Sequence, residues 1–217
     1  MREAFHDQLD SIFIDLSGIA RQVQEAVAQA TEALLEGSAE IAEQVISNDV
    51  KIDLARERVE DQTFSLLSLQ QPVAGDLRTL VAALRMVSDL ERMGDLAVHV
   101  AKIARLRVPE RAVPEDVEPT IRKMAMVAEL MTGKVADIIA DRDVAAAADL
   151  HEVDEKMDQL RRKSFRELLG ANWTHGIEPA VDLALLGRYY ERIADHAVSV
   201  ADRVHYVVTG ELASTDA

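Results

Sequence analysis

The chain has no cysteine, and this absence excludes disulfide bonds and thiolate metal sites. Carboxylate and imidazole groups are therefore the metal ligands that its side chains offer. Tryptophan occurs once, glycine 9 times, and aromatic residues make up 4% of the 217 residues, so β-strands are poorly supplied. A composition that is 48% hydrophobic suits one long helical domain or two small similar ones.

Basic residues are also scarce, with 24 lysines and arginines against 39 acidic residues and a formal net charge of −15. No basic stripe is available to displace phosphate counterions, so we expect no nucleic-acid partner. The chain lacks a run of about 18 uncharged apolar residues, and residues 1–7 lack the basic-then-apolar pattern of a signal peptide. We therefore expect a cytoplasmic protein with no direct membrane insertion.

Apolar residues recur at steps of three and four, which is the period of an α-helix, from Phe5 to Leu35. Gly37 is placed to end this helix, and Ser38 to cap the next one. Further helices are predicted from Ser38 to near Gln70, Val73 to Leu106, Val117 to Ala140, Asp143 to Gly170 and Pro179 to Val208. The sequence thus predicts an all-α protein.

Two prolines, Pro109 and Pro114, interrupt the helical pattern within residues 108–116, which we interpret as a linker. The pattern then restarts, and several segments of the first half have counterparts in the second. We therefore expect six long helices as two tandem three-helix bundles related by an internal repeat, with residues 1–107 in the first bundle and 117–217 in the second.

The most distinctive repeat is Glu91-Arg92-Met93-Gly94-Asp95, which returns a hundred positions later as Glu191-Arg192-Ile193-Ala194-Asp195. Each copy sets two carboxylates four residues apart, and such residues share one face of a helix. Apolar residues, among them Leu80 and Val87, fall within about 40° of Glu91 on the helical wheel. A carboxylate beside apolar surface loses hydration, so each copy needs a positively charged partner.

Each half also carries an earlier pair of aspartates with the same spacing of four. Packing of the second and third helices of each half would bring together two sets of carboxylates: Asp49, Asp53, Glu91 and Asp95 in the first half, and Asp154, Asp158, Glu191 and Asp195 in the second. Hard, oxygen-preferring cations such as Mg²⁺, Mn²⁺ or iron would relieve the repulsion within each set.

Arginine side chains are the alternative source of positive charge. Arg56 and Arg161 each lie three residues after an aspartate of a set, and Arg92 and Arg192 are placed to reach a neighbouring helix. Both interpretations stay open at this point. His99 shares a face with Asp95, but its counterpart is a serine, which favours a solvated histidine over a ligand.

The sequence lacks the two Glu-x-x-His motifs that together bind metal in di-iron bundles, and it has no glycine-rich phosphate loop and no nucleophilic cysteine, so we expect no enzymatic activity. The doubled Glu-Arg-x-x-Asp, the segment from Gln71 to Arg78, the Asp-x-x-x-Asp pairs and the closing Val208-Thr209-Gly210 together resemble the PhoU family. The resemblance covers nearly the whole chain.

This resemblance implies a non-enzymatic, negative regulator of phosphate homeostasis. Such a protein would act as an adaptor between the phosphate ABC transporter, through its cytoplasmic ATPase, and a phosphate-sensing sensor histidine kinase of a two-component system. It would be a homodimer in the cytoplasm that becomes peripheral at the inner membrane through its partners.

The resemblance also implies metal binding, because some relatives bind iron or zinc through the motifs that match the two carboxylate sets. Iron, zinc, manganese and magnesium are the candidate cofactors. Leu96 stands where the family often has histidine, and Lys102 stands where an acidic residue is frequent, so we expect the second set to be the better metal site. A carboxylate bundle for metal storage or metal handling is the alternative function.

Overall fold

The computed structural model describes residues 2–212, and every regular element in that range is an α-helix. The helices are α1 (Arg2–Glu36), α2 (Ala39–Gln70), α3 (Gly75–Arg107), α4 (Glu118–Asp141), α5 (Val144–Leu168) and α6 (Ile177–Thr209). Each matches a helix predicted from the periodicity to within a few residues. The outermost bounds predicted for the two bundles, Met1 and Ala217, lie outside the described residues.

Capping side chains and left-handed glycines fix the ends of these helices as the sequence predicts. The hydroxyl of Ser38 accepts a hydrogen bond from the backbone N–H of Ile41 at the start of α2. The carboxylate of Asp143 accepts two backbone N–H groups at the start of α5. Gly37 and Gly210, which follow α1 and α6, have φ angles of 69° and 81°, a region in which glycine has no steric penalty.

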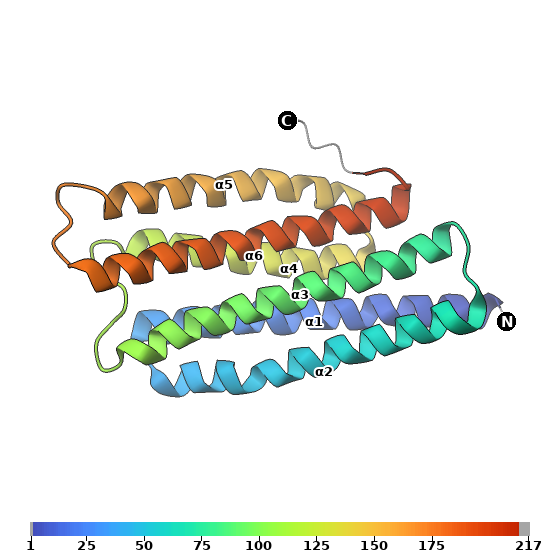
Figure 1. Cartoon of the computed structure of the whole chain (residues 1–217). Coiled ribbons are helices and arrows are strands. Elements are labelled where there is room, and N and C mark those ends of the chain that lie inside the picture. The colour runs from blue at the N-terminus through green and yellow to red at the C-terminus, as the bar shows by residue number, and fades with distance from the viewer. Residues whose placement is uncertain (1, 213–217) are drawn as a thin grey trace.

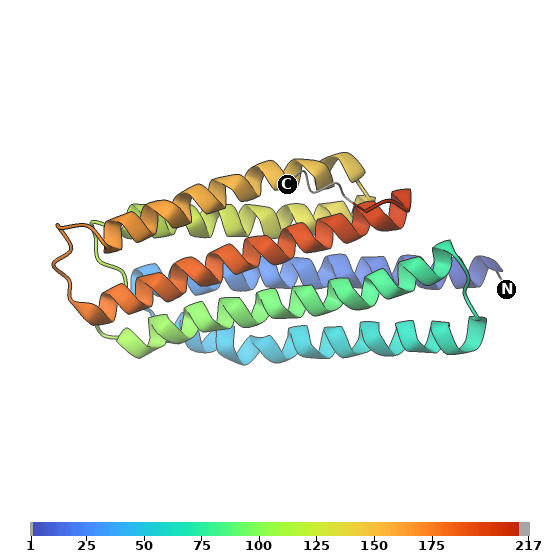
Figure 2. The ribbon, with the colours of Figure 1, turned by 45° about the horizontal axis from the view of Figure 1, so that its top comes forward.

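The helices form two layers (Figures 1 and 2). In one layer α2, α3, α6 and α5 lie side by side in that order, and α1 and α4 form the other. Within the chain, α1 packs against α2, α3 and α4, while α4 packs against α1, α5 and α6. The prediction of two tandem three-helix bundles is therefore confirmed, with α1–α3 in one bundle and α4–α6 in the other. We call the side of the four-helix layer that faces away from α1 and α4 the four-helix face.

The apolar core is continuous through both bundles because α3 packs on α6 and α1 packs on α4. Fully buried side chains at this junction include Leu90 on α3 and Tyr190 on α6, which occupy equivalent positions of the internal repeat. The residues that surround the two carboxylate motifs are thus core residues, and the acidic side chains emerge from the edge of the core.

Among the largest fully buried side chains within residues 2–212, only Tyr190 carries a hydroxyl, and this hydroxyl lies 2.9 Å from that of Thr31 on α1. The Thr31 hydroxyl donates its hydrogen to the carbonyl of Val27, 2.8 Å away. Because that hydrogen is already used, Tyr190 must be the donor to Thr31. This hydrogen bond between Tyr190 and Thr31 links the two bundles.

None of the helices within residues 2–212 is both long and apolar enough to cross a lipid bilayer.

The donor assignment predicts unequal costs for two conservative substitutions. Tyr190→Phe removes the donor and leaves Thr31 bonded to Val27, so we expect a loss of about 1 kcal/mol in the free energy of unfolding. Thr31→Val leaves the Tyr190 hydroxyl buried without an acceptor, so we expect the larger loss, about 2 kcal/mol. When Thr31→Val is added to Tyr190→Phe, the further loss in the free energy of unfolding should be small, because no buried tyrosine hydroxyl is then left without an acceptor. Urea denaturation of all four proteins tests this, and a smaller cost for Thr31→Val than for Tyr190→Phe would contradict the assignment.

Candidate acidic sites

The first carboxylate set lies along the seam between α2 and α3, near the middle of both helices. Since α1 covers one side of this seam, the exposed Asp95 must face the other side, which is the four-helix face. Gly94 lets the helices approach closely, because a Cβ atom there would lie 3.0 Å from Ile52 and 3.6 Å from a carboxylate oxygen of Asp49. The carboxylates of the set are therefore held near one another, as the sequence predicts.

Burial and mutual repulsion both act on this first set. Burial raises the pKa of Asp49 to about 6, with further repulsion from Asp95, Asp53 and Glu91. The pKa of Glu91 is raised by burial and then by the charge of Asp95. Partial burial removes water from the carboxylates, and nearby negative charges make ionisation more costly still.

Positive charge around the first set is weak. Within residues 2–212 none of its four carboxylates forms an ion pair. Arg56, which the sequence places near this set, forms its ion pair with Glu60 on its own helix at 2.9 Å, and its charge also lowers the pKa of Glu91. Lys102 lowers the pKa of Asp49, so its ammonium group supplies part of the missing charge. Leu96 is buried in the core, where an apolar side chain is suited to packing.

The second set lies along the equivalent seam between α5 and α6. Burial raises the pKa of Asp154 to about 6, and the charges of Asp195 and Asp158 add to the shift. The pKa of Asp195 is also raised by burial, followed by the charge of Glu191. Both halves of the chain thus bring their four predicted carboxylates into electrostatic contact.

The second set differs from the first because two arginines form ion pairs with one of its carboxylates. Arg161 on α5 approaches one oxygen of Glu191 to 3.0 Å, and Arg188 on α6 binds the other oxygen. Arg162 also pairs with Asp158, at 3.4 Å. The arginine alternative is therefore realised in the second set, where both oxygens of the buried Glu191 are already bound.

These arginines count against the expectation that the second set is the better metal site. Glu191 could ligate a cation only by giving up its arginines, whereas the first set has the donor chemistry of a hard-cation site and no competing ion pair. In the part of the chain that the structure describes, no three His, Asp or Glu side chains stand close enough together to coordinate one ion. Carboxylate rotamers would therefore have to change for a metal to bind.

The two histidines beside the motifs contact the opposite bundle. The ring of His99 on α3 stacks on Tyr189 of α6, with centroids 5.3 Å apart. Nδ1 of His196 on α6 lies 3.0 Å from the carboxylate of Asp89 on α3, and Arg203 binds the same carboxylate at 3.1 Å. These contacts join α3 to α6.

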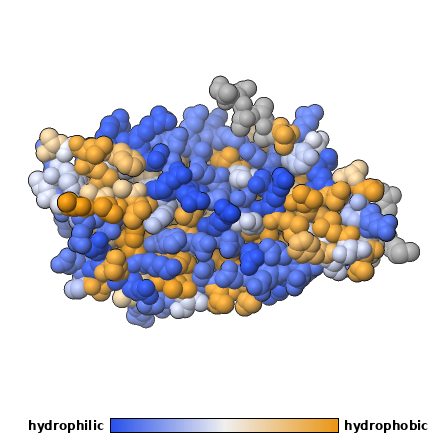
Figure 3. Space-filling model, viewed as in Figure 1, coloured by the Kyte–Doolittle hydropathy of each residue, from blue (hydrophilic) through white to orange (hydrophobic). Residues whose placement is uncertain are grey.

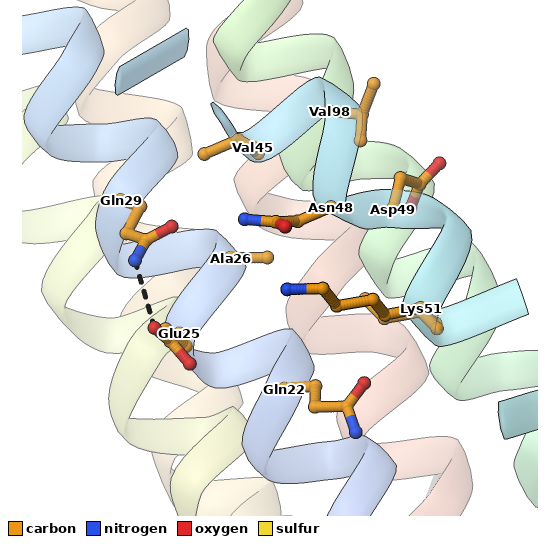
Figure 4. Close-up of a pocket in the computed structure, with 10 residues that line it drawn as sticks. Gln22, Glu25, Ala26, Gln29, Val45, Asn48, Asp49, Lys51 and Val98 are labelled. Carbon is orange, nitrogen blue, oxygen red and sulfur yellow. Dashed lines mark hydrogen bonds between the residues drawn. The ribbon is translucent and has the colours of Figure 1, made fainter. Parts of the chain in front are cut away.

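A small pocket of about 90 Å³ lies beside Asp49, between α1 and α2. Figure 4 shows the side chains of Asn48, Lys51 and Gln22 in the gap between the two helices, while the carboxylate of Asp49 points away from α1. Asp49 therefore lines one side of this pocket while its carboxylate is directed away from α1, and most of the other lining side chains are polar.

Both seams open onto the four-helix face, since α4 covers the second seam as α1 covers the first. Figure 3 shows this face with a hydrophilic band across its middle and hydrophobic surface toward both ends. The carboxylate sets come from the middle of α2, α3, α5 and α6, so they contribute to one continuous polar band.

Sequence reasoning missed two residues that shape these sites. Arg188 lies three positions before Glu191, and this spacing on one helix face is a signal that could have identified it as a partner. Asp89 is buried and bonded to side chains of the other bundle, and no spacing in the sequence indicates that contact.

The fold and sites define a class of all-helical proteins with two tandem three-helix repeats and one acidic seam in each repeat. A family model described as the PhoU domain matches residues 16–104 and 121–204. The chain therefore belongs to the PhoU family, as its motifs indicate.

Relatives and solved structures agree with this assignment. The chain is 45% identical over 210 residues to a phosphate-specific transport system accessory protein, PhoU homolog 2, of Mycobacterium tuberculosis, covering 97% of this chain and 99% of the relative. It is 44% identical to PhoU homolog 1 of Mycobacterium leprae, covering 100% and 97%. The crystal structure of PhoU from Pseudomonas aeruginosa superposes with a TM-score of 0.87 at 27% identity, covering 97% of this chain and 100% of that one. The PhoU structure from Streptococcus pneumoniae gives 0.86 at 26% identity, covering 97% and 99%.

The raised pKa values predict that neutral side chains stabilise the metal-free protein. Asp49 and Asp154 bind protons more tightly in the folded than in the unfolded chain, so the free energy of unfolding should fall as pH rises from about 4 through about 6. The double variant Asp49→Asn, Asp154→Asn removes these charges. We expect it to be more stable than wild type at pH 8 by about 1 kcal/mol per site, since solvent screens part of the shift.

The advantage of the variant should shrink at pH 5.5, where the wild-type carboxylates are largely protonated. Denaturation with urea in the presence of chelator measures both values. Asp149→Asn, an exposed position on α5, is the matched control and should change little. A double variant that is less stable than wild type at pH 8 would show that the carboxylates are not mutually repelling.

Proposed function

We propose that this protein is a non-enzymatic negative regulator of phosphate homeostasis that acts by docking. The comparisons establish an accessory protein of the phosphate transport system as its nearest functional description. The finer proposal is that it links the cytoplasmic ATPase of the phosphate ABC transporter to the phosphate-sensing histidine kinase. In this role it would act in the cytoplasm as a homodimer and reach the inner membrane through its partners.

The observation that carries this proposal is the position of both acidic sets on the four-helix face. An isolated acidic cluster is common on a protein surface, but two equivalent clusters on one broad face present a repeated pattern of negative charge. A face of this kind is complementary to a surface with spaced basic residues, and charge complementarity favours both encounter and orientation of a partner.

Exposed apolar residues flank the polar band and add to its suitability for docking. On α6, Ile177, Val181 and Leu185 are spaced by four and are 83%, 51% and 41% exposed. Hydrophobic surface next to a charged band is typical of protein interfaces. The hydrophobic end of Figure 3 over the start of α6 shows this combination.

The docking proposal predicts that charge reversal on the four-helix face weakens partner binding. We expect Glu91→Lys, Asp95→Lys to reduce affinity for the purified transporter ATPase or kinase cytoplasmic region at least tenfold, because like charges would then face each other across the interface. Biolayer interferometry with each purified partner measures this, and circular dichroism checks that helicity is retained.

The chain offers a matched control on the opposite layer. Glu32 and Glu36 are exposed on α1 with the same spacing of four, so Glu32→Lys, Glu36→Lys makes an equal change of charge away from the four-helix face. This control should bind like wild type. Equal losses in both double variants would attribute the effect to net charge, and no loss in either would remove the four-helix face from partner docking.

We also propose that the first carboxylate set holds a hard divalent or trivalent cation. The supporting observation is four carboxylates in electrostatic contact with no ion pair among the described residues. Lys102 and Arg56 neutralise the set only in part. A bound cation would supply the remaining positive charge and would hold α2 against α3. Mn²⁺, Mg²⁺, iron and zinc remain the candidates.

Cation binding at the first set predicts unequal effects of two double variants. Titration of chelator-treated protein with Mn²⁺ by calorimetry should show binding that Glu91→Gln, Asp95→Asn weakens at least tenfold, since two ligands are neutralised. Glu191→Gln, Asp195→Asn should have the smaller effect, because Glu191 is already bound by arginines. The reverse order, or absence of binding in wild type, would contradict the proposal.

The alternative function, metal storage or handling, is distinguished by elemental analysis. Storage requires stoichiometric metal that is retained after purification in chelator and, for iron, redox turnover. Regulation requires neither.

A further inference from the structure

A groove that contains several arginines lies where α3 begins and α6 ends. The groove has a volume of about 640 Å³, which lies within the range of small-molecule sites, roughly 300–1,000 Å³. Its main lining residues are Leu77, Arg78, Val81, Arg85, Arg203 and Tyr206. The hydrophobic surface over the start of α3 in Figure 3 belongs to this end of the molecule.

Three arginines face one acidic residue in this groove, although the whole chain carries a net charge of −15. The acidic residue, Asp202, is bound to His151 at 2.8 Å. Arg85 is exposed, and its side chain makes no hydrogen bond or ion pair within residues 2–212. The groove is thus locally electropositive, and neighbouring side chains do not neutralise all of its positive charge.

The other two arginines are held in place but keep donors free. Arg203 binds Asp89 through one terminal nitrogen, and Arg78 donates from one terminal nitrogen to the carbonyl of Val207, 3.3 Å away. The Nε of each is sealed from solvent, so it is not available to a ligand in the groove. The two terminal nitrogens of a guanidinium carry four N–H donors, so each arginine retains terminal donors for an anion.

The position of Arg78 is fixed by packing. Its guanidinium lies 5.5 Å from the centre of the Tyr206 ring, a cation–π contact. Gly210 leaves the space for it, since a Cβ there would stand 2.9 Å from Nη1 of Arg78. Such preorganisation reduces the entropy that a ligand must remove on binding.

Apolar side chains form the remaining wall. Leu77 and Val81 are 42% and 40% exposed, and Leu212 lines the same groove. A ligand that fills the groove would therefore combine an anionic group, placed on the arginines, with an apolar or aromatic portion, placed against the leucine, valine and tyrosine side chains. Guanidinium groups match phosphate oxygens in bidentate geometry.

We propose that this groove binds a phosphorylated small molecule with an aromatic portion, the chemistry of a nucleoside phosphate. A small ligand is favoured over an acidic peptide because the chain outside the groove is strongly acidic and would repel negative charges that extend beyond it. The groove lies at the ends of α3 and α6, whereas the carboxylate sets lie at their middles. The proposal therefore stands or falls independently of the proposed function.

Binding of a fluorescent N-methylanthraniloyl derivative of ATP, followed by anisotropy without added metal, tests the proposal. We expect saturable binding with Kd below about 1 mM and displacement by unlabelled ATP. Arg85→Gln should weaken binding about tenfold, the loss expected for one charged hydrogen bond. Arg58→Gln, at an exposed arginine on α2 outside the groove, is the matched control and should bind like wild type. Circular dichroism confirms that both variants are folded.

Three results would overturn the proposal. The first is no saturable binding of the nucleotide to the wild-type protein, and the second is an equal affinity in Arg85→Gln and wild type. The third is displacement by inorganic triphosphate as effective as displacement by ATP, since the apolar wall would then contribute nothing. If a hexaglutamate peptide binds and Arg85→Gln abolishes that binding while the nucleotide does not bind, the groove is a peptide-docking surface and not a nucleotide site.

Discussion

The packing of α3 on α6 is the contact on which the rest of the structure depends. These helices are the third members of their repeats, and their contact buries Leu90 and Tyr190 at equivalent positions. It also requires that the carboxylate of Asp89, placed in an apolar junction, be bound by His196 and Arg203. Burial of a charge is tolerated only with such partners, so this polar cluster fixes how the two bundles meet.

The same contact determines how the acidic sites are arranged. Because α3 and α6 lie at the centre of the four-helix layer, the seam that each forms with its outer neighbour opens onto the same face. The internal repeat thus places two sets of carboxylates on one surface. Their charges are balanced differently, since Glu191 forms ion pairs with two arginines while the first set has only the unpaired electrostatic influence of Lys102, Arg56 and Arg92.

Burial and repulsion make the carboxylate sets costly to the folded protein, and this cost indicates a use beyond stability. The pKa values of about 6 at Asp49 and Asp154 show that both seams disfavour negative charge at neutral pH. A basic partner surface or a cation would relieve that cost. The docking proposed above fits this physical picture, because a basic partner surface would relieve repulsion within the free protein.

The sequence by itself determined the six helices, the repeat and the spacing within each pair of carboxylates, because helical periodicity, capping residues and spacings of four are local properties. Even the arginine partners were open to inference, since Arg188 and Glu191 lie on one helix. Only the tertiary structure decided which set keeps its charges unpaired, that Asp89 binds across the bundles, and that Arg203 joins Arg78 and Arg85 in one groove. Those outcomes depend on the relative positions of helices distant in the chain, and no local pattern encodes them.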